Sequence, residues 1–159
     1  MGKKYKWGIL ASGKMSAKFT RGLQLLENAE LYSVGSRDAG RAKQFAEEFG
    51  FGKYYGSYEE FASDPELEIV YIASPHSHHL EHTMLCLKNG KHVLCEKAFS
   101  LNHHEVQMMV NEAKKQNLFL MEALWPPFQP FYKKAEEILN SGAAGKIVHL
   151  DGYFSFQGL

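Results

Sequence analysis

The sequence predicts an α/β protein built on a Rossmann-type, doubly wound parallel sheet. Two observations predict this fold class. Short apolar runs alternate with helical stretches over about 120 residues, as in successive βαβ units. The first run also leads through a glycine turn into a helix. Such sheets bind ligands beyond the carboxyl ends of their strands, so the residues that follow each strand are the candidates for function.

The composition of the 159-residue chain is that of a globular protein and excludes several classes of partner. The 18 basic residues balance the 18 acidic ones, so no basic face for nucleic acid is expected. Hydrophobic residues make up 45% of the chain, which argues against disorder. Cys86 and Cys95 give neither a disulfide framework nor a paired zinc-ligand spacing. Because we find no secretory signal and no membrane span, we expect a cytoplasmic protein without a membrane partner.

Apolar runs and helical periodicity divide most of the chain into strands and the helices between them. Predicted strands lie at 7–11, 31–34, 53–55, 69–73, 92–95 and 119–121. Predicted helices lie at 15–26, 39–49, 57–63, 79–89 and 102–117. Ser57 and Asn102 each precede a glutamate by three residues, which is the capping-box spacing that opens a helix. Gly50 and Gly90 mark helix ends.

The last part of the chain has a different pattern and predicts the start of a second domain. Closely spaced prolines after Trp125 exclude a regular helix interior. A helix is expected at 131–141 and a long strand at 147–156, and a strand this long needs a sheet partner. We therefore predict a Rossmann domain over 1–122. Over 123–159 we predict the linker, helix and first strand of a truncated C-terminal α+β domain.

The predicted last strand would carry apolar side chains on an exposed edge, namely Tyr153, Phe154 and Phe156. Such an edge promotes pairing with another chain. We therefore expect a homo-oligomer that forms through residues near 147–157.

The first turn, residues 11–16, reads Ala-Ser-Gly-Lys-Met-Ser between a strand and a helix. It departs from the dinucleotide fingerprint G-x-G-x-x-G at Ala11 and Ser16. It keeps the middle glycine, Gly13, which lets the backbone approach a pyrophosphate. The helix that follows supplies N–H donors at its N-terminus. The turn favours a dinucleotide site, and the alternative is a tight turn without a ligand.

The end of the second strand indicates which dinucleotide is bound. NAD sites place an Asp or Glu about 20 residues beyond the glycines to bind the ribose hydroxyls. Here Ser36 and Arg37 stand instead, and a guanidinium suits the 2′-phosphate of NADP because it pairs bidentately with phosphate oxygens. The pair favours NADP over NAD, and the alternative is a solvated Arg37 beside Asp38.

Histidines are concentrated after the fourth strand, within residues 76–82. His78 and His82 are four residues apart, which would put them on one helical face and suggests a metal hypothesis. Carboxylates are few in this stretch and no cysteine is near. We therefore predict no metal, and expect histidines at a helix start beside a cofactor.

Two later strand ends carry further candidates. Lys97 follows Glu96 after the fifth strand, where a lysine in a water-poor cleft exchanges protons near neutrality or binds a substrate hydroxyl. The alternative is a surface ion pair. Trp125, after the sixth strand, would stack on a ligand ring or plug the domain junction.

Together these segments resemble the Gfo/Idh/MocA (glucose–fructose oxidoreductase/inositol dehydrogenase/MocA) family of oxidoreductases over nearly the whole chain. The resemblance rests on residues 7–10, 36–38, 55–60, 74–79, 90–97 and 121–125. Its most specific part is Glu96–Lys97 after a Gly-Lys-His-Val-Leu strand. Within the family, the chain is most similar to the branch of dihydrodiol and NADP-dependent xylose dehydrogenases.

The resemblance implies hydride transfer between a nicotinamide and a hydroxyl-bearing carbon of a sugar or cyclic diol. It also implies that Lys97 is catalytic, binding the reacting hydroxyl and assisting its proton transfer. The remaining implied positions all contact the cofactor. They are Ser12, Gly13, Lys14 and Met15 at the pyrophosphate, Ser36 and Arg37 at the 2′-phosphate, Ser74, Pro75, His76 and His79 along its middle, and Glu96, Lys97 and Trp125 around the nicotinamide.

The chain departs from the family pattern at Ala98, where a proline is usual, at Pro127, where an arginine is usual, and at Ala11. The other catalytic side chains of the family are expected in a C-terminal domain. The expected function is the cofactor-binding part of an NADP-dependent oxidoreductase. The alternative is a non-catalytic NADP-binding module or a truncated remnant. A methyltransferase that binds S-adenosylmethionine would need an acid where Ser36 and Arg37 stand.

Overall fold

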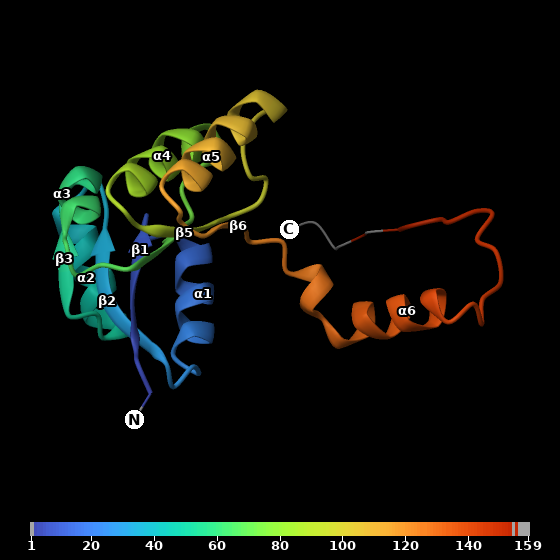
Figure 1. Cartoon of the computed structure of the whole chain (residues 1–159). Helices are drawn as coiled ribbons and strands as arrows, with labels where there is room; N and C mark the ends of the chain where they lie inside the picture. The colour runs from blue at the N-terminus through green and yellow to red at the C-terminus, as the bar shows by residue number, and fades with distance from the viewer. Residues whose placement is uncertain (1, 154, 156–159) are drawn as a thin grey trace. The chain divides into compact units, whose positions relative to one another are not determined.

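The computed structural model describes residues 2–153 and 155 and divides the chain into two compact units, Met1–Ala123 and Leu124–Leu159 (Figure 1). The first unit contains the sheet and most of the helices, and the second contains a 3₁₀ turn and one helix. Among the described residues, no helix has both the length and the apolar character needed to cross a membrane.

The first unit is built on a six-stranded sheet in which every strand pair is parallel. The strands are β1 (Tyr5–Leu10), β2 (Ala29–Gly35), β3 (Lys53–Tyr55), β4 (Ile69–Ile72), β5 (His92–Cys95) and β6 (Leu120–Glu122). Their order across the sheet is β3-β2-β1-β4-β5-β6, so the order reverses between β1 and β4. This order confirms the predicted doubly wound Rossmann fold and identifies the topological switch point.

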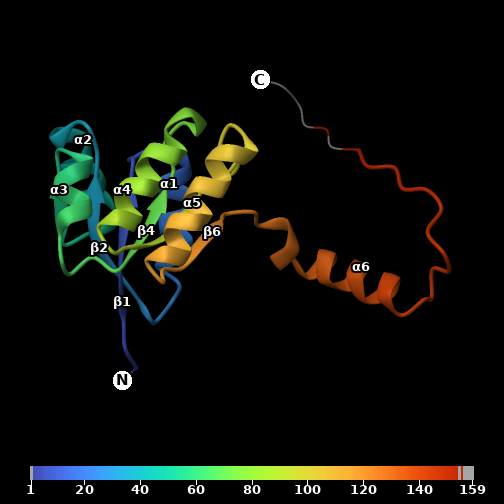
Figure 2. The ribbon, with the colours of Figure 1, turned by 45° about the horizontal axis from the view of Figure 1, so that its top comes forward.

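Helices cover both faces of the sheet (Figure 2). They are α1 (Lys14–Leu23), α2 (Ala39–Phe49), α3 (Tyr58–Ser63), α4 (His79–Lys88) and α5 (His103–Lys115), with the 3₁₀ turn η1 (His76–His78) before α4. Successive residues of β1 point to opposite faces of the sheet and pack into two different hydrophobic clusters. Ile9 packs with Phe45 of α2, whereas Leu10 packs with Phe61 of α3 and Leu87 of α4. Burial on both faces explains why the strands are continuous apolar runs in the sequence.

Local sequence signals set most helix ends, as predicted. The side chains of Ser57 and Asn102 cap α3 and α5 by accepting backbone N–H groups three residues later, at 3.1 and 3.0 Å. Gly50 ends α2 in the left-handed conformation, with φ of 81°. The helix predicted over 15–26 is wrong at its end. It stops at Leu23, because Gly22 weakens its last turn.

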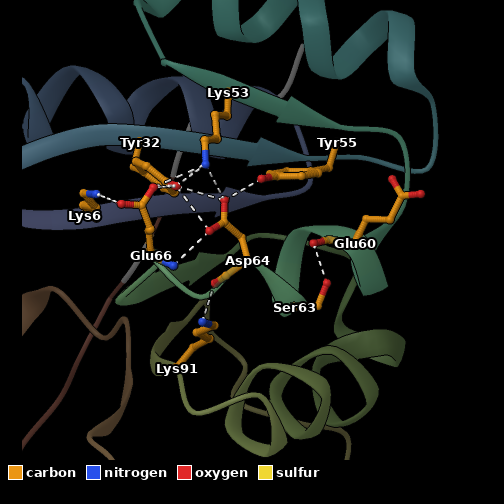
Figure 3. Close-up of polar contacts among 9 residues, drawn as sticks. All are labelled: Lys6, Tyr32, Lys53, Tyr55, Glu60, Ser63, Asp64, Glu66 and Lys91. Atoms are coloured by element: carbon orange, nitrogen blue, oxygen red, sulfur yellow. Dashed lines mark hydrogen bonds and ion pairs between the residues drawn. The ribbon is translucent and has the colours of Figure 1, made fainter.

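A polar cluster centred on Asp64 joins the sheet to the connection between α3 and β4 (Figure 3). Its carboxylate accepts hydrogen bonds from the hydroxyls of Tyr32 and Tyr55 and from Nζ of Lys53. The ammonium group of Lys91 donates to the backbone carbonyl of Asp64 at 2.6 Å. Asp64 is only 7% exposed, so the bonds from Tyr32, Tyr55 and Lys53 to its carboxylate satisfy a buried charge that would otherwise be costly.

The second unit contains η2 (Pro126–Phe128) and α6 (Pro130–Asn140). The long strand predicted at 147–156 is wrong for the described residues, since 147–153 and 155 are irregular. A strand forms only beside a partner that accepts its hydrogen bonds, and the six strands of the sheet all belong to the first unit. Positions 154, 156 and 157 of that prediction lie outside the described residues.

Candidate functional site

The carboxyl ends of β1, β2 and β4 open into one cleft of about 560 Å³ beside the switch point. Five residues singled out from the sequence meet there. They are Ser12, Gly13, Ser36, Arg37 and Pro75. The structure adds Arg41 and Tyr58, which the sequence analysis missed. The cleft therefore lies where doubly wound sheets bind their ligands.

The turn between β1 and α1 presents backbone groups rather than side chains. Ala11 has φ of 76°, the left-handed region that a glycine at this fingerprint position adopts without strain. A Cβ at Gly13 would meet open space, so the backbone here is accessible. The buried Ser16 donates its hydroxyl to the carbonyl of Ala11 and holds α1 against the strand end. Lys14 and Met15 are exposed in the first turn of α1, whose N–H groups suit an anion.

Two arginines stand at the end of β2. The buried hydroxyl of Ser36 accepts the N–H of Asp38 at 3.3 Å and shapes the loop into α2. The carboxylate of Asp38 then caps α2 by accepting the N–H of Arg41 at 2.9 Å. Arg37 and Arg41 both line the cleft, and two arginines in one cleft suit a phosphate dianion. The signal that could have located Arg41 is Asp38, because an aspartate that caps α2 places Arg41 in the first turn of that helix, beside the strand end.

A second hollow, of about 400 Å³, shares Arg37, Tyr58 and Pro75 with the cleft. Burial raises the pKa of the Tyr58 phenol. Ser74 is buried beneath this hollow, and its hydroxyl lies 2.8 Å from Nδ1 of His82. The hollow extends the cleft along the loop that follows β4.

His79 and His76 were both expected beside a cofactor, but their environments differ. The ring of His79 is fully buried, with Nδ1 2.8 Å from the carbonyl oxygen of Ala98 and Nε2 2.9 Å from that of Ser74. It therefore connects the loop after β4 to the segment after β5. His76 is exposed, and its ring lies edge-on to that of His79 with centroids 5.4 Å apart.

The segment after β5 is anchored on both sides of Lys97. The carboxylate of Glu96 accepts the hydroxyl of Tyr71, whose pKa is raised first by burial and then by this bond. On the other side of Lys97, the backbone N–H of Phe99 donates to the carboxylate of Glu122 at 2.9 Å. The peptide bond between Lys97 and Ala98 is cis. The side chain of Lys97 is exposed, whereas the backbone on both sides of it is anchored by these hydrogen bonds.

The arrangement suits an elongated anionic ligand. The start of α1 offers N–H donors, the end of β2 offers guanidinium groups and the end of β5 offers an ammonium group, all at the carboxyl edge of one sheet. Trp125 belongs to the second unit, where its side chain is 60% exposed.

Comparisons with known proteins agree with this geometry. The sequence model of the family described as "Oxidoreductase family, NAD-binding Rossmann fold" (GFO_IDH_MocA) matches residues 5–124. The trans-1,2-dihydrobenzene-1,2-diol dehydrogenase of Mus musculus is 42% identical over 154 residues, which are 96% of this chain and 46% of the mouse protein.

Solved structures show the same fold. An NAD binding oxidoreductase from Klebsiella pneumoniae superposes with a TM-score of 0.83 at 27% identity, over 89% of this chain and 40% of that one. A mutant 3-ketoreductase from Actinomadura kijaniata, in complex with TDP-benzene and NADP, has a TM-score of 0.85 at 25% identity, over 91% of this chain and 46% of that one. The chain thus spans less than half the length of these relatives.

Proposed function

The chain belongs to the Gfo/Idh/MocA oxidoreductase family, and on that premise we propose that its cleft binds NADP as the cofactor-binding part of a dehydrogenase. Rossmann domains of this family bind nicotinamide dinucleotides. The preference for NADP over NAD is inferred from this chain's own residues.

The pair of guanidinium groups at the end of β2 carries the proposal. Arg37 and Arg41 line the cleft beside the buried hydroxyl of Ser36, where a ribose-binding acid would favour NAD. Asp38, the acid in this loop, is engaged as the cap of α2. Two cations and a hydroxyl are complementary to a 2′-phosphate.

The remaining contacts follow the path of the cofactor along the carboxyl edge. Ser12, Gly13, Lys14 and Met15 would hold the pyrophosphate through the N-terminus of α1. Ser74, Pro75 and His76 would line its middle, with His79 holding the loop from behind. Glu96, Lys97 and Trp125 would surround the nicotinamide, whose chemistry is hydride transfer.

Lys97 is the proposed catalytic residue. Its ammonium group would bind the reacting hydroxyl of the substrate and assist the movement of its proton, while the tethered segment fixes its position. The proposed substrate is a small sugar or cyclic diol. This class is consistent with the names of the dihydrodiol dehydrogenase relatives. The rest of the substrate site would come from an α+β domain that begins in residues 123–159.

A non-catalytic NADP-binding module is the second candidate. It is favoured by Pro127, which stands where the family pattern has an arginine. The two candidates differ in turnover. When the chain is joined to a C-terminal domain from a relative, a dehydrogenase transfers hydride from the hydroxyl-bearing carbon of a sugar or diol to NADP, and a binding module does not.

Titration of the purified chain with NADPH and with NADH, followed by tryptophan fluorescence, tests the cofactor. We expect tighter binding of NADPH, and we expect Arg37→Ala to weaken NADPH about tenfold or more while NADH changes little, because a charge-assisted phosphate pair is lost. Lys43→Ala is the matched control, since Lys43 is an exposed cation on α2 outside the cleft. Equal affinity for both dinucleotides, unchanged by Arg37→Ala, would overturn the NADP proposal.

We also propose self-association through residues near 147–157. Val148, Leu150 and Tyr153 are apolar and 75% or more exposed, which favours burial against a second copy. Light scattering at rising concentration measures this, and a monomer at every concentration contradicts it. A cytoplasmic location remains a prediction from the sequence.

A further inference from the structure

A group of metal-ligating side chains lies at the start of α4, outside the contacts assigned to the cofactor. The donor atoms of His78, Glu81 and His82 all lie within 4.8 Å of one another. Their spacing of three and four residues puts them on one helical face. The three side chains also line the 400 Å³ hollow that adjoins the cleft. The metal hypothesis from the sequence rested on His78 and His82 and did not include Glu81.

The ring of His82 is held in place by two neighbouring side chains. Its Nδ1 lies 2.8 Å from the buried hydroxyl of Ser74, and the ring of Tyr58 packs edge-on against it with centroids 4.6 Å apart. When Nδ1 donates to Ser74, the lone pair is on Nε2, which is the arrangement typical of zinc-bound imidazoles.

The other two side chains are able to close around an ion. The carboxylate of Glu81 lies 3.4 Å from Nδ1 of His78, and the rings of His78 and His82 are stacked with centroids 5.5 Å apart. Donor atoms on a tetrahedral zinc ion are about 3.3 Å apart, given bonds near 2 Å. Because Glu81 is exposed and His78 is half-buried, small rotations of these two side chains supply the difference.

We propose that His78, Glu81 and His82 bind one divalent transition-metal ion of the zinc class, with its fourth position open to the hollow. Two imidazoles and a carboxylate are a donor set that zinc accepts, and three protein ligands leave room for a water molecule. Arg37 lines the same hollow and opposes a cation there, so binding is weaker than at a structural zinc site. The inference does not depend on the proposed NADP binding.

Calorimetric titration of the whole chain with Zn²⁺, and visible absorption with Co²⁺, test the site. We expect a single ion per chain and Co²⁺ bands typical of a four- or five-coordinate centre. Glu81→Gln and His78→Gln should each weaken binding about tenfold or more, because each removes a ligand. Glu81 is exposed and His78 is half-buried, so neither substitution alters the core, and circular dichroism checks that both variants keep the fold.

His104→Gln is the control, because His104 is exposed on α5 and outside this group. Binding that is weakened by Glu81→Gln and His78→Gln but unchanged by His104→Gln supports the site. The absence of any bound ion overturns the proposal. Binding that is equally strong in wild type, Glu81→Gln and His78→Gln also overturns it, since the ion would then be held elsewhere.

Discussion

Asp64 shows at the scale of a single residue how one buried carboxylate stabilises several elements. Burial by itself would raise the pKa of Asp64. The hydrogen bonds from Tyr55, Lys53, Tyr32 and the backbone of Glu66 outweigh burial and hold that pKa well below its ordinary value. A carboxyl group whose pKa is lower in the folded chain stabilises the fold above its unfolded pKa of about 4. That stabilisation is lost as the pH falls towards the folded pKa.

Asp64→Asn is therefore expected to lower the free energy of unfolding by about 2 kcal/mol at pH 7, because Asn keeps the shape but loses the charged acceptors. Urea unfolding at pH 7 and pH 3 measures this. The difference between wild type and variant should shrink at pH 3, where the wild-type carboxylate has lost part of its advantage. Glu60→Gln, an exposed position on α3, should show little change at either pH. A difference that is independent of pH would mean that the charge of Asp64 does not provide the stabilisation.

Residues of the candidate site were predictable where a local pattern marks them. Gly13 and Arg37 follow strands at the fingerprint spacing, so the sequence identified them. Tyr58 reaches the cleft through tertiary packing of α3, which no local pattern encodes. His79 was expected at a cofactor, but the positions of its two ring nitrogens beside two carbonyl oxygens depend on how the loops after β4 and β5 meet.

At the scale of elements, α3 packs closely onto the sheet because two glycines leave room for Phe61. A Cβ at Gly35 would meet Cγ of Phe61 at 2.6 Å, and one at Gly8 would meet its Cζ at 2.6 Å. Phe61 is fully buried, so its ring has no open space to move into.

We expect Gly35→Ala to destabilise the fold by about 2 kcal/mol through overpacking. Phe61→Leu should cost less in the Gly35→Ala background than in wild type, because the smaller side chain relieves the contact. Urea unfolding of the two single variants and the double variant gives the coupling. Gly52→Ala is the control, since its Cβ would meet only a carbonyl oxygen at 3.7 Å. Additive effects of the two substitutions would contradict this packing.

Element positions were predictable where caps and apolar runs agree. The predicted bounds of β3 and β5 match those observed, and α2 runs from Ala39 to Phe49 as expected. The strand predicted at 147–156 had a suitable pattern but lacks a pairing partner among the described residues, and pairing is a non-local condition.

At the scale of the whole molecule, the two units differ in what stabilises them. Among the described residues, every buried hydrophobic side chain lies between Ile9 and Ala113, inside the first unit. The helix α6 of the second unit has no buried residue. The first unit therefore has a complete core of its own, whereas the second exposes apolar side chains such as Phe131 and Val148.

A chain that ends at Ala123 should consequently fold cooperatively, because it retains both cores and all six strands. Its NADPH affinity should stay within about twofold of the full chain if the phosphate contacts dominate binding. Its self-association should disappear, because the exposed apolar segment is gone. Thermal unfolding, NADPH titration and light scattering on both chains measure these three properties. An unfolded fragment would show that the first unit needs the second for stability, and a folded fragment that still self-associates would place the interface within residues 1–123.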